Sequence, residues 1–589
     1  MSFNQDAADR LDEIARMLEL LGEDRFKVNA HARAARAVEA HAADLKPIAH
    51  DTKALTAIEG IGVKIAAKIT EFAESGAMSE HAELLTRVPA GLLDMMRVPG
   101  LGPKTVKAIW ETLNVTDTAG LKAAIADGRI MQVPRMGTKT VENIKKSLET
   151  VAQGEQRLLL GRALPIAEAL QSRLAEVAGV ESVQYAGSLR RGKETIGDID
   201  LLAVAPGPAS ERLREAFCTM PEVNQVLIRG ETKCSIRLTF ERKTVQADLR
   251  IVPAKSWGAA LMYFTGSKEH NVRLRERALK RGVTLNEYGL FKLDDNDTPH
   301  QHRPNGLEQA VAGDTEESVF KALGLPFIPP ELRESVGELD APPPTDLIEL
   351  ADVRSELHAH TTASDGVLSI VQLATLYQLR GFHTLAITDH SKSSVIANGL
   401  TPERLREHIR NIRAAQAEVP GITLLVGSEV DILSDGTLDY DDDLLAELDV
   451  VIASPHASLR QEPRLATERL LKAIRHPLVH VIGHPTGRII AQREGLEPAM
   501  EELCAAAAEH NTALEINANW LRLDLRDTHA RLALSKGCLL AIHCDTHHPD
   551  DAENLRYGVI TARRAGCPQE RCINTWERAK LVKWLKSKR

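Results

Sequence analysis

The stretch Gly187-Ser188-Leu189-Arg190-Arg191-Gly192-Lys193-Glu194-Thr195-Ile196-Gly197-Asp198-Ile199-Asp200 decides how the middle of this chain folds. Asp198 and Asp200 are two residues apart, and a strand places such residues on one face. The apolar residues that interleave and follow them are typical of a buried strand. The Gly-Ser turn offers hydrogen-bond donors to a phosphate, and the arginines add positive charge. Since Mg²⁺ is bound by one or two carboxylates plus substrate phosphates, the stretch predicts phosphoryl transfer.

The size and composition of the chain favour a cytoplasmic protein of several domains. A length of 589 residues exceeds what one hydrophobic core supports. No apolar run reaches about 18 residues, so we expect no contact with a membrane. The polar N-terminus argues against a secretory signal. The seven cysteines form no CxxC pair, as expected for reduced thiols in a cytosol.

The charge is unevenly distributed along the chain. The net charge of −9 by itself argues against a nucleic-acid partner. Residues 101–293, however, hold 30 lysines and arginines against 21 acidic residues. A basic middle between acidic ends is compatible with DNA binding, although it does not establish it.

Three similar segments in the first 150 residues each follow an apolar helical stretch and open another. They are residues 55–64, 96–104 and 131–139, and the third has Arg135 where the others have a glycine. They resemble the helix-hairpin-helix element, in which backbone N–H groups at a helix start bind a DNA phosphate. The alternative for a single copy is a helix turn with a glycine cap. The candidate DNA contacts are Gly60, Gly62, Lys64, Gly100, Gly102 and Lys104.

The rest of the chain alternates strand-like and helical stretches, which predicts α/β folds. A second strand at 244–252 carries another acid, Asp248. From 353 to about 580, about seven apolar runs end in histidine or acidic residues. Functional residues at the carboxyl ends of strands are how a β/α barrel builds its site.

The segment 187–200, with Asp248 and Tyr263-Phe264-Thr265-Gly266-Ser267, resembles the family X DNA polymerases, the DNA polymerase beta type. The likeness covers roughly residues 8–330. It implies that Asp198, Asp200 and Asp248 form a two-metal Mg²⁺ site for nucleotide addition to a primer. It also implies two groups of contacts. For the nucleotide these are Gly187, Ser188, Arg191, Gly197, Tyr263, Phe264, Gly266 and Asn271, and for DNA they are Lys233 and Arg275.

The N-terminal part resembles the lyase domain of the same family. Lys68 lies at the position of its Schiff-base lysine, and Lys64 at that of a phosphate-binding lysine. The sequence departs from the family pattern at His31, where a tyrosine is expected, and at Ala67, where a glutamate is expected. The alternative for Lys68 is a solvated helix residue.

Residues 353–580 resemble the PHP (polymerase and histidinol phosphatase) superfamily. The likeness rests on the segment 356–366, with its His-x-His pair, and on ligand-type residues that follow later strands. It implies nine ligands for up to three ions, Zn²⁺ or Mn²⁺. These are His358, His360, Asp365, His390, Glu429, His456, His484, Asp545 and His547. Arg488 is a further candidate for gripping a phosphate.

The expected fold is therefore multidomain α/β: a helical helix-hairpin-helix domain, an α+β nucleotidyltransferase palm with a thumb-type subdomain, and a distorted (β/α)7 barrel. The expected boundaries are 1–85 (lyase-like), 86–154 (helix-hairpin-helix), 155–258 (palm), 259–330 (subdomain contacting the nascent base pair), 331–352 (Pro-rich linker) and 353–589 (PHP barrel).

The resemblances together predict a monomeric repair enzyme on the nucleoid. It would fill short gaps in gapped or primed DNA with dNTPs, as in base excision repair. The PHP barrel would act as a 3′→5′ exonuclease, with 3′-phosphatase or abasic-site endonuclease action as extensions. Two alternatives stay open: a hydrolase of small phosphate esters, which the barrel alone permits, and a non-catalytic DNA-binding scaffold.

Overall fold

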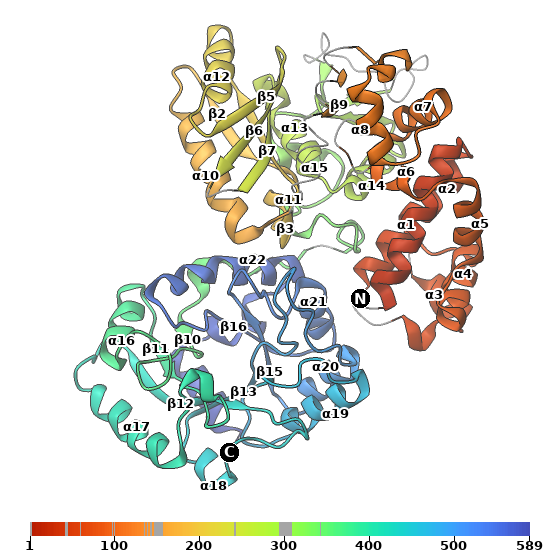
Figure 1. Cartoon of the computed structure of the whole chain (residues 1–589). Coiled ribbons are helices and arrows are strands. Elements are labelled where there is room, and N and C mark those ends of the chain that lie inside the picture. Colours follow the sequence, from red (N-terminus) through yellow and green to blue (C-terminus); the bar gives the residue numbers. More distant parts are fainter. Residues whose placement is uncertain are drawn as a thin grey trace. The chain divides into compact units, whose positions relative to one another are not determined.

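The protein is described from a computed structural model of the whole chain (Figure 1). The described residues are 3–41, 45–58, 60–96, 98, 101–134, 136–137, 140–141, 144–145, 157–240, 243–293, 309–341 and 343–588. The chain divides into two compact units, Met1–Gln156 and Arg157–Arg589. Within the described ranges, no helix combines the length and the hydropathy that a membrane span needs.

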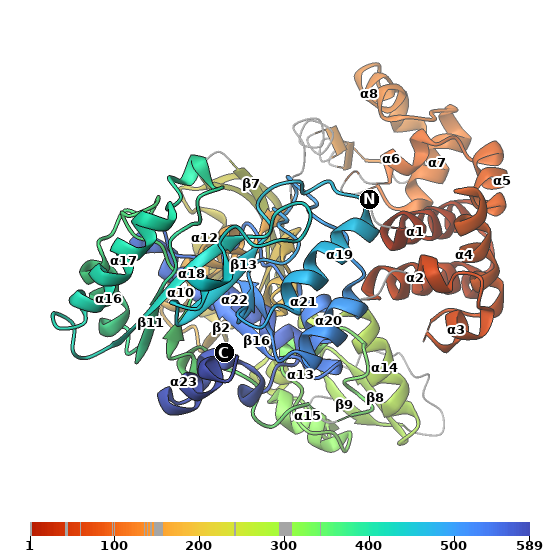
Figure 2. The ribbon, with the colours of Figure 1, turned by 90° about the horizontal axis from the view of Figure 1, so that it is seen from below.

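The first unit is helical. Its elements are α1 (Phe3–Leu21), α2 (Arg25–Ala40), η1 (Lys46–Ile48), α3 (Thr52–Ala57), α4 (Val63–Ser75), α5 (Ser79–Arg87), α6 (Gly91–Met95), α7 (Pro103–Leu113), α8 (Thr118–Ala126) and η2 (Arg129–Gln132). Helices α1 and α2 pack side by side and bury their apolar stripes in one core (Figure 2). The expected phosphate-binding Gly100, together with Arg135 and the 154/155 boundary, lies outside the described residues.

The second unit begins with a mixed five-stranded sheet in the order β2-β4-β7-β6-β5. The strands are β2 (Ser182–Tyr185), β4 (Asp198–Val204), β5 (Val223–Arg229), β6 (Lys233–Phe240) and β7 (Lys243–Ile251). A short pair, β1 (Leu158–Leu159) and β3 (Thr195–Ile196), lies beside it, with helices α10 (Leu160–Ala175), α11 (Gly187–Arg190), α12 (Pro208–Cys218) and η3 (Ala254–Ser256).

The two faces of β4 have different roles. Ile199, Leu201 and Ala203 point into a core shared with α10 and α12. Because side chains alternate along a strand, Asp198 and Asp200 share the opposite face with Leu202. Leu202 packs against Ala260 of helix α13 (Trp257–Thr265). The acidic face of the sheet therefore continues into the layer formed by α13.

A smaller helical layer follows the sheet. It comprises α13, α14 (Lys268–Leu279), α15 (Glu316–Ala322) and the hairpin of β8 (Val283–Asn286) and β9 (Gly289–Lys292). The Pro-rich segment 331–352, expected to be a linker, packs closely here. It contributes η5 (Pro330–Leu332), η6 (Leu350–Asp352) and the fully buried side chain of Arg333, which hydrogen-bonds Glu316 and the carbonyl of Ile328.

The C-terminal part is a parallel sheet of seven strands in sequential order, ringed by helices (Figure 1). The strands are β10 (Ser355–Glu356), β11 (Thr384–Ile387), β12 (Thr423–Asp431), β13 (Val450–Ser454), β14 (Val481–Ile482), β15 (Ala513–Asn517) and β16 (Leu540–His543). A parallel bridge between Ala359 and Thr546 joins the first strand's end to the last. This nearly closed barrel confirms the predicted (β/α)7 fold.

The helices around the barrel are α16 (Ile370–Leu379), α17 (Pro402–Ala415), α18 (Asp442–Leu445), α19 (Pro463–Ile474), α20 (Met500–Glu509), α21 (Asp527–Ser535), α22 (Leu555–Ala565) and α23 (Arg578–Lys586). The short helical turns are η7 (Val395–Ala397), η8 (Pro549–Asn554), η9 (Gln569–Arg571) and η10 (Ile573–Thr575).

Candidate active sites

The three acids expected to bind metal meet on two adjacent strands: Asp198 and Asp200 begin β4, and Asp248 lies on β7. Strands β4 and β7 run parallel, with Asp200 in register with Asp248 and Asp198 in register with Gln246. Burial raises the pKa of Asp200, and the nearby charges of Asp198 and Asp248 raise it further, to about 7. Such crowding of like charges is relieved by a divalent cation, so the donor set fits a metal site.

The turn before β4 fits tightly against this cluster. Gly187 has a φ of +62°, and a Cβ at this position would stand 2.4 Å from Asp200 Oδ2. Lys233, expected to contact the template strand, forms an ion pair with Asp248 at 2.6 Å. Its ammonium group therefore neutralises part of the negative charge of the three carboxylates.

The expected nucleotide contacts gather between α11 and the end of α13. Arg191 Nη1 donates to the carbonyl of Thr265, and a Cβ at Gly266 would lie 3.0 Å from the same nitrogen. Asn271 Nδ2 donates to the carbonyl of Tyr263 at 2.6 Å. These hydrogen bonds join the glycine turn, the aromatic pair and helix α14 into one wall.

The remaining expected contacts lie close to this wall. The rings of Tyr263 and Phe264 meet edge to face, with centroids 5.1 Å apart. Ser188 is in the first turn of α11, and Gly197 is exposed immediately before β4. Arg275 lies one turn beyond Asn271 and donates from Nε to its carbonyl at 3.3 Å.

In the first unit, two glycine turns place a lysine at matching positions. Gly62 caps α4 and Gly102 caps α7, both with extended backbone, and Lys64 and Lys104 are exposed at the second residue of each helix. Gly60 has a φ of +99°, which favours glycine. The described residues of these two turns thus have the geometry of a phosphate-binding helix start.

The candidate lyase residue is held in a charged cluster. Lys68 Nζ pairs with Glu80 at 2.8 Å, and Lys27 and His31 contact the same carboxylate at 3.0 and 3.1 Å. His31, which stands where the family has a tyrosine, therefore helps to anchor Glu80.

All nine expected metal ligands converge at the carboxyl ends of the barrel strands. Glu429 is central: its oxygens lie 2.8 Å from His390 Nδ1, 2.9 Å from His484 Nε2 and 3.2 Å from His456 Nε2. Overlapping groups of ligand atoms close enough to share an ion comprise His360, Asp365, His390 and His547; His358, His360, Glu429 and Asp545; and His390, Glu429 and His456.

The donor atoms of these side chains are arranged to bind metal ions and are not satisfied by hydrogen bonds to one another. Although imidazole nitrogens approach Glu429 closely, none of these approaches has hydrogen-bond geometry, and both oxygens of Glu429 and the Nε2 atoms of His358 and His360 are buried without a hydrogen bond. Burial, with the neighbouring His390 and His547, lowers the pKa of His360 to about 4. The imidazole is then neutral at neutral pH, the form that binds a metal ion. Converging, unsatisfied donors of this kind are what a cluster of divalent ions requires.

Sequence reasoning missed the residues that orient these ligands. Glu515 accepts hydrogen bonds from Nδ1 of His358 at 2.7 Å and Nδ1 of His543 at 2.8 Å. Asp431 pairs with Nδ1 of His456 at 3.0 Å. A carboxylate behind a ligating imidazole fixes its tautomer. A signal was present in the sequence, because Glu515 lies inside the apolar strand β15 and Asp431 ends the strand β12.

Two other polar residues of the barrel, Glu356 and Arg488, make hydrogen bonds within the protein. Glu356 is fully buried and accepts hydrogen bonds from the backbone N–H groups of His358 and Cys544, so it holds the ends of two strands together. Arg488, considered for gripping a phosphate, donates to Glu194 at 2.7 Å and to the carbonyl of Leu523.

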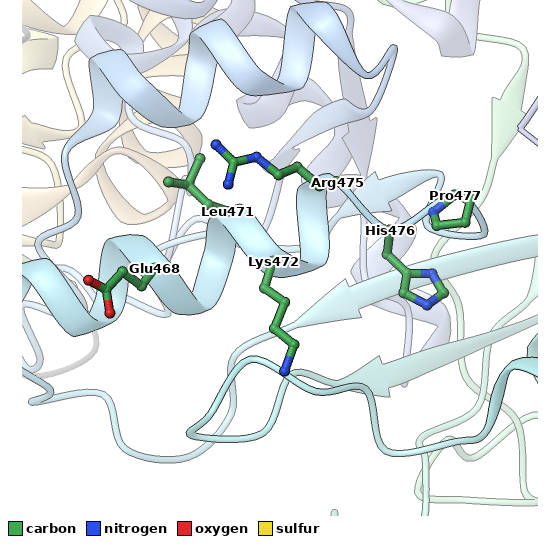
Figure 3. Close-up of a pocket in the computed structure, with 6 residues that line it drawn as sticks. All are labelled: Glu468, Leu471, Lys472, Arg475, His476 and Pro477. Atoms are coloured by element: carbon green, nitrogen blue, oxygen red, sulfur yellow. The ribbon is translucent and has the colours of Figure 1, made fainter.

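A separate cavity of about 420 Å³ lies along α19 (Figure 3). It is lined by Glu468, Leu471, Lys472, Arg475, His476 and Pro477. None of these residues was expected in either site, so the cavity is part of neither the acid triad nor the barrel ligand cluster.

Four family models match the chain. A helix-hairpin-helix domain matches residues 2–78 and a SAM-like helix-hairpin-helix tandem matches 92–150. The DNA polymerase beta thumb matches 260–334, and the PHP domain matches 356–519.

Comparison of the whole sequence finds relatives of the polymerase-type part, of the PHP part and of the two together. The DNA polymerase/3′-5′ exonuclease PolX of Bacillus subtilis (strain 168) is 36% identical over 565 residues, 96% of each chain. DNA polymerase lambda of Rattus norvegicus is 27% identical over 56% of each chain. A probable phosphatase of Thermoanaerobacter sp. (strain X514) is 27% identical over 40% of this chain and 95% of its own length.

Proposed function

The chain belongs to the family X DNA polymerases that carry a C-terminal PHP domain, and on this basis we propose that it fills short gaps in DNA and trims 3′ ends. The observation that supports the proposal is that one chain brings together two separate groups of candidate metal ligands. One is the acid triad on β4 and β7, and the other is the histidine-rich ring of the barrel. Two opposed reactions at a primer end need two such sites.

For synthesis, Asp198, Asp200 and Asp248 would hold Mg²⁺. When bound, the metal activates the primer 3′-hydroxyl and neutralises the leaving pyrophosphate. Arg191, close to Ser188, would grip the triphosphate from the end of α11. The edge-to-face pair Tyr263–Phe264 would stand against the sugar, with Asn271 and Arg275 toward the base pair. Lys233 would shift from Asp248 toward the template.

For trimming, the nine barrel residues would hold up to three Zn²⁺ or Mn²⁺ ions. When bound, such ions polarise the scissile phosphate and lower the pKa of the attacking water. Glu515 and Asp431 hold His358 and His456 with Nε2 directed toward the site. The phosphatase relative favours phosphomonoesters as additional substrates, which would include a 3′-phosphate left at a damaged end.

DNA would be gripped independently of sequence. The helix starts at Gly62 and Gly102, with Lys64 and Lys104, offer N–H groups and positive charge to phosphates. We expect a monomer located on the nucleoid in the cytoplasm, with dNTPs as the nucleotide substrates. Sedimentation with and without a gapped duplex tests the monomeric state.

One assay separates the two activities. A gapped duplex with a labelled primer is incubated with Mg²⁺ or Mn²⁺, with and without dNTPs. Asp200→Ala should abolish extension and keep 3′→5′ shortening, whereas His360→Ala should do the opposite. Extension by Asp200→Ala at the wild-type rate would refute the polymerase assignment.

Two additional measurements, turnover of a small phosphomonoester and binding of the gapped duplex, test the rival interpretations. Faster turnover of a small phosphomonoester than of the 3′-recessed oligonucleotide would favour a small-molecule phosphohydrolase. Binding of the gapped duplex with neither extension nor shortening would favour a scaffold.

A further inference from the structure

The PHP barrel packs directly against the turn that is expected to hold the triphosphate. Gly192, just after α11, has a φ of +66°, and a Cβ there would lie 2.2 Å from Ile560 of α22. From the same helix, Arg564 donates to the backbone carbonyl of Arg191. Helix α22 carries none of the nine barrel ligands, so this contact belongs to neither metal site.

Arg191 has an acidic partner here in addition to its carbonyl acceptor. Its Nε lies 3.1 Å from Glu334 Oε1, and both side chains are largely buried, with exposed fractions of 13% and 16%. A triphosphate that takes the Nε donor of this guanidinium must displace Glu334. Apparent affinity falls when the binding-competent state is only partly populated, so Glu334 weakens nucleotide binding.

Glu334 Oε1 is also paired with a second arginine, Arg564. Arg564 Nη1 lies 3.0 Å from Glu334 Oε1, while its Nη2 pairs with Asp527 at 2.7 Å. Burial alone would raise the pKa of Glu334, but Arg564 and Arg191 outweigh it and hold it at about 2. Glu334 is therefore charged at neutral pH, and a buried carboxylate without a partner is unfavourable. Arg564 keeps Glu334 paired when Arg191 leaves.

We propose that Glu334 competes with the incoming nucleotide for Arg191, and that Arg564 of the PHP barrel tunes this competition by remaining on Glu334. Both are positioning residues: they act through Arg191 and do not touch the nucleotide. The inference rests on the proposed function, because it takes Arg191 as the triphosphate contact. It adds that the nuclease domain sets the nucleotide affinity of the polymerase site.

Opposite effects of two substitutions test the inference. Glu334→Gln releases Arg191 and should lower the KM for dNTP in single-nucleotide gap filling by about 3- to 10-fold, with kcat nearly unchanged. Arg564→Met leaves Arg191 as the remaining arginine on Glu334 and should raise this KM by a similar factor. Arg564→Lys keeps the positive charge, so its KM for dNTP should lie between those of the wild-type protein and Arg564→Met.

The double variant and a matched control complete the experiment. In Glu334→Gln/Arg564→Met, Arg564 can no longer act through Glu334, so the KM should fall from that of Arg564→Met toward that of Glu334→Gln, even though the contacts of Arg564 with Asp527 and the Arg191 carbonyl are lost as well. Arg563→Met is the control, because Arg563 pairs with Glu331 and the carbonyl of Ile348 instead. It should leave the KM for dNTP unchanged. Thermal unfolding and 3′→5′ shortening report whether each variant is folded.

Each outcome supports or overturns the inference. Unchanged KM values in folded Glu334→Gln and Arg564→Met would overturn it, as would additive losses of kcat, which indicate structural damage alone. Absence of gap filling in the wild-type protein would instead refute the proposed function itself.

Discussion

Replacing Gly187 by alanine should disable synthesis and spare the nuclease. A Cβ at this position would stand 2.4 Å from Asp200 Oδ2, about 0.6 Å closer than the 3.0 Å limit of real Cβ contacts. The carboxylate must therefore retreat by that distance or more. A displacement approaching 1 Å in a reacting group reduces the rate by about 10²-fold, or about 2.7 kcal/mol of transition-state stabilisation. The left-handed backbone adds a destabilisation of about 1–2 kcal/mol.

The assay is single-nucleotide gap filling under kcat/KM conditions, with 3′→5′ shortening measured in parallel. Gly282→Ala is the matched control, because Gly282 has a φ of +72° and open space where the Cβ would stand. It shares the backbone strain without the clash, so it should lose stability and keep gap filling. Gap filling by Gly187→Ala at the rate of Gly282→Ala would refute the close fit between this turn and Asp200.

Three further predictions concern other parts of the chain. Glu515→Gln should weaken metal binding by the barrel by about 10- to 100-fold and leave gap filling intact, as measured by metal content after dialysis and by shortening at graded Mn²⁺. Burial raises the pKa of Glu316, but the buried Arg333 and the half-buried Arg190 lower it from 4.5 to about 2. The folded value lies below the unfolded one, so about 3 kcal/mol of stability, present above pH 4.5, is lost as the pH falls toward 2. Urea unfolding should show that the free energy of unfolding falls less between pH 6 and pH 3.5 in Glu316→Gln than in the wild-type protein. Borohydride should trap the protein on abasic DNA and fail to trap Lys68→Ala; equal trapping would exclude Lys68 as the Schiff-base residue.

Much of the fold, and the candidates for both ligand sets, could be predicted from the sequence through local patterns and family resemblance. The spacing of Asp198 and Asp200 fixes which face of a strand they share, and this needs no partner. In the barrel, most of the candidate ligands lie near the carboxyl end of an apolar strand, and parallel strands bring these ends to one edge. The barrel and the family could therefore be predicted without tertiary information, and the nine candidate ligands were implied by the family resemblance.

What the sequence alone could not determine depends on pairs of residues far apart along the chain. Glu515 is one acid in an apolar strand until folding brings it to His358, 157 residues away. The Pro-rich segment has the composition of a linker, yet Arg333 within it is buried against Glu316.

The contact of Arg564 with Arg191 and Glu334 shows the same limit most clearly. No local pattern marks an arginine on a barrel helix as a partner of the nucleotide-binding turn. Local periodicity determines which elements form and which side chains share a face. Which charged groups meet across elements is decided only by tertiary packing, since a buried charge takes whichever partner the packing brings within reach.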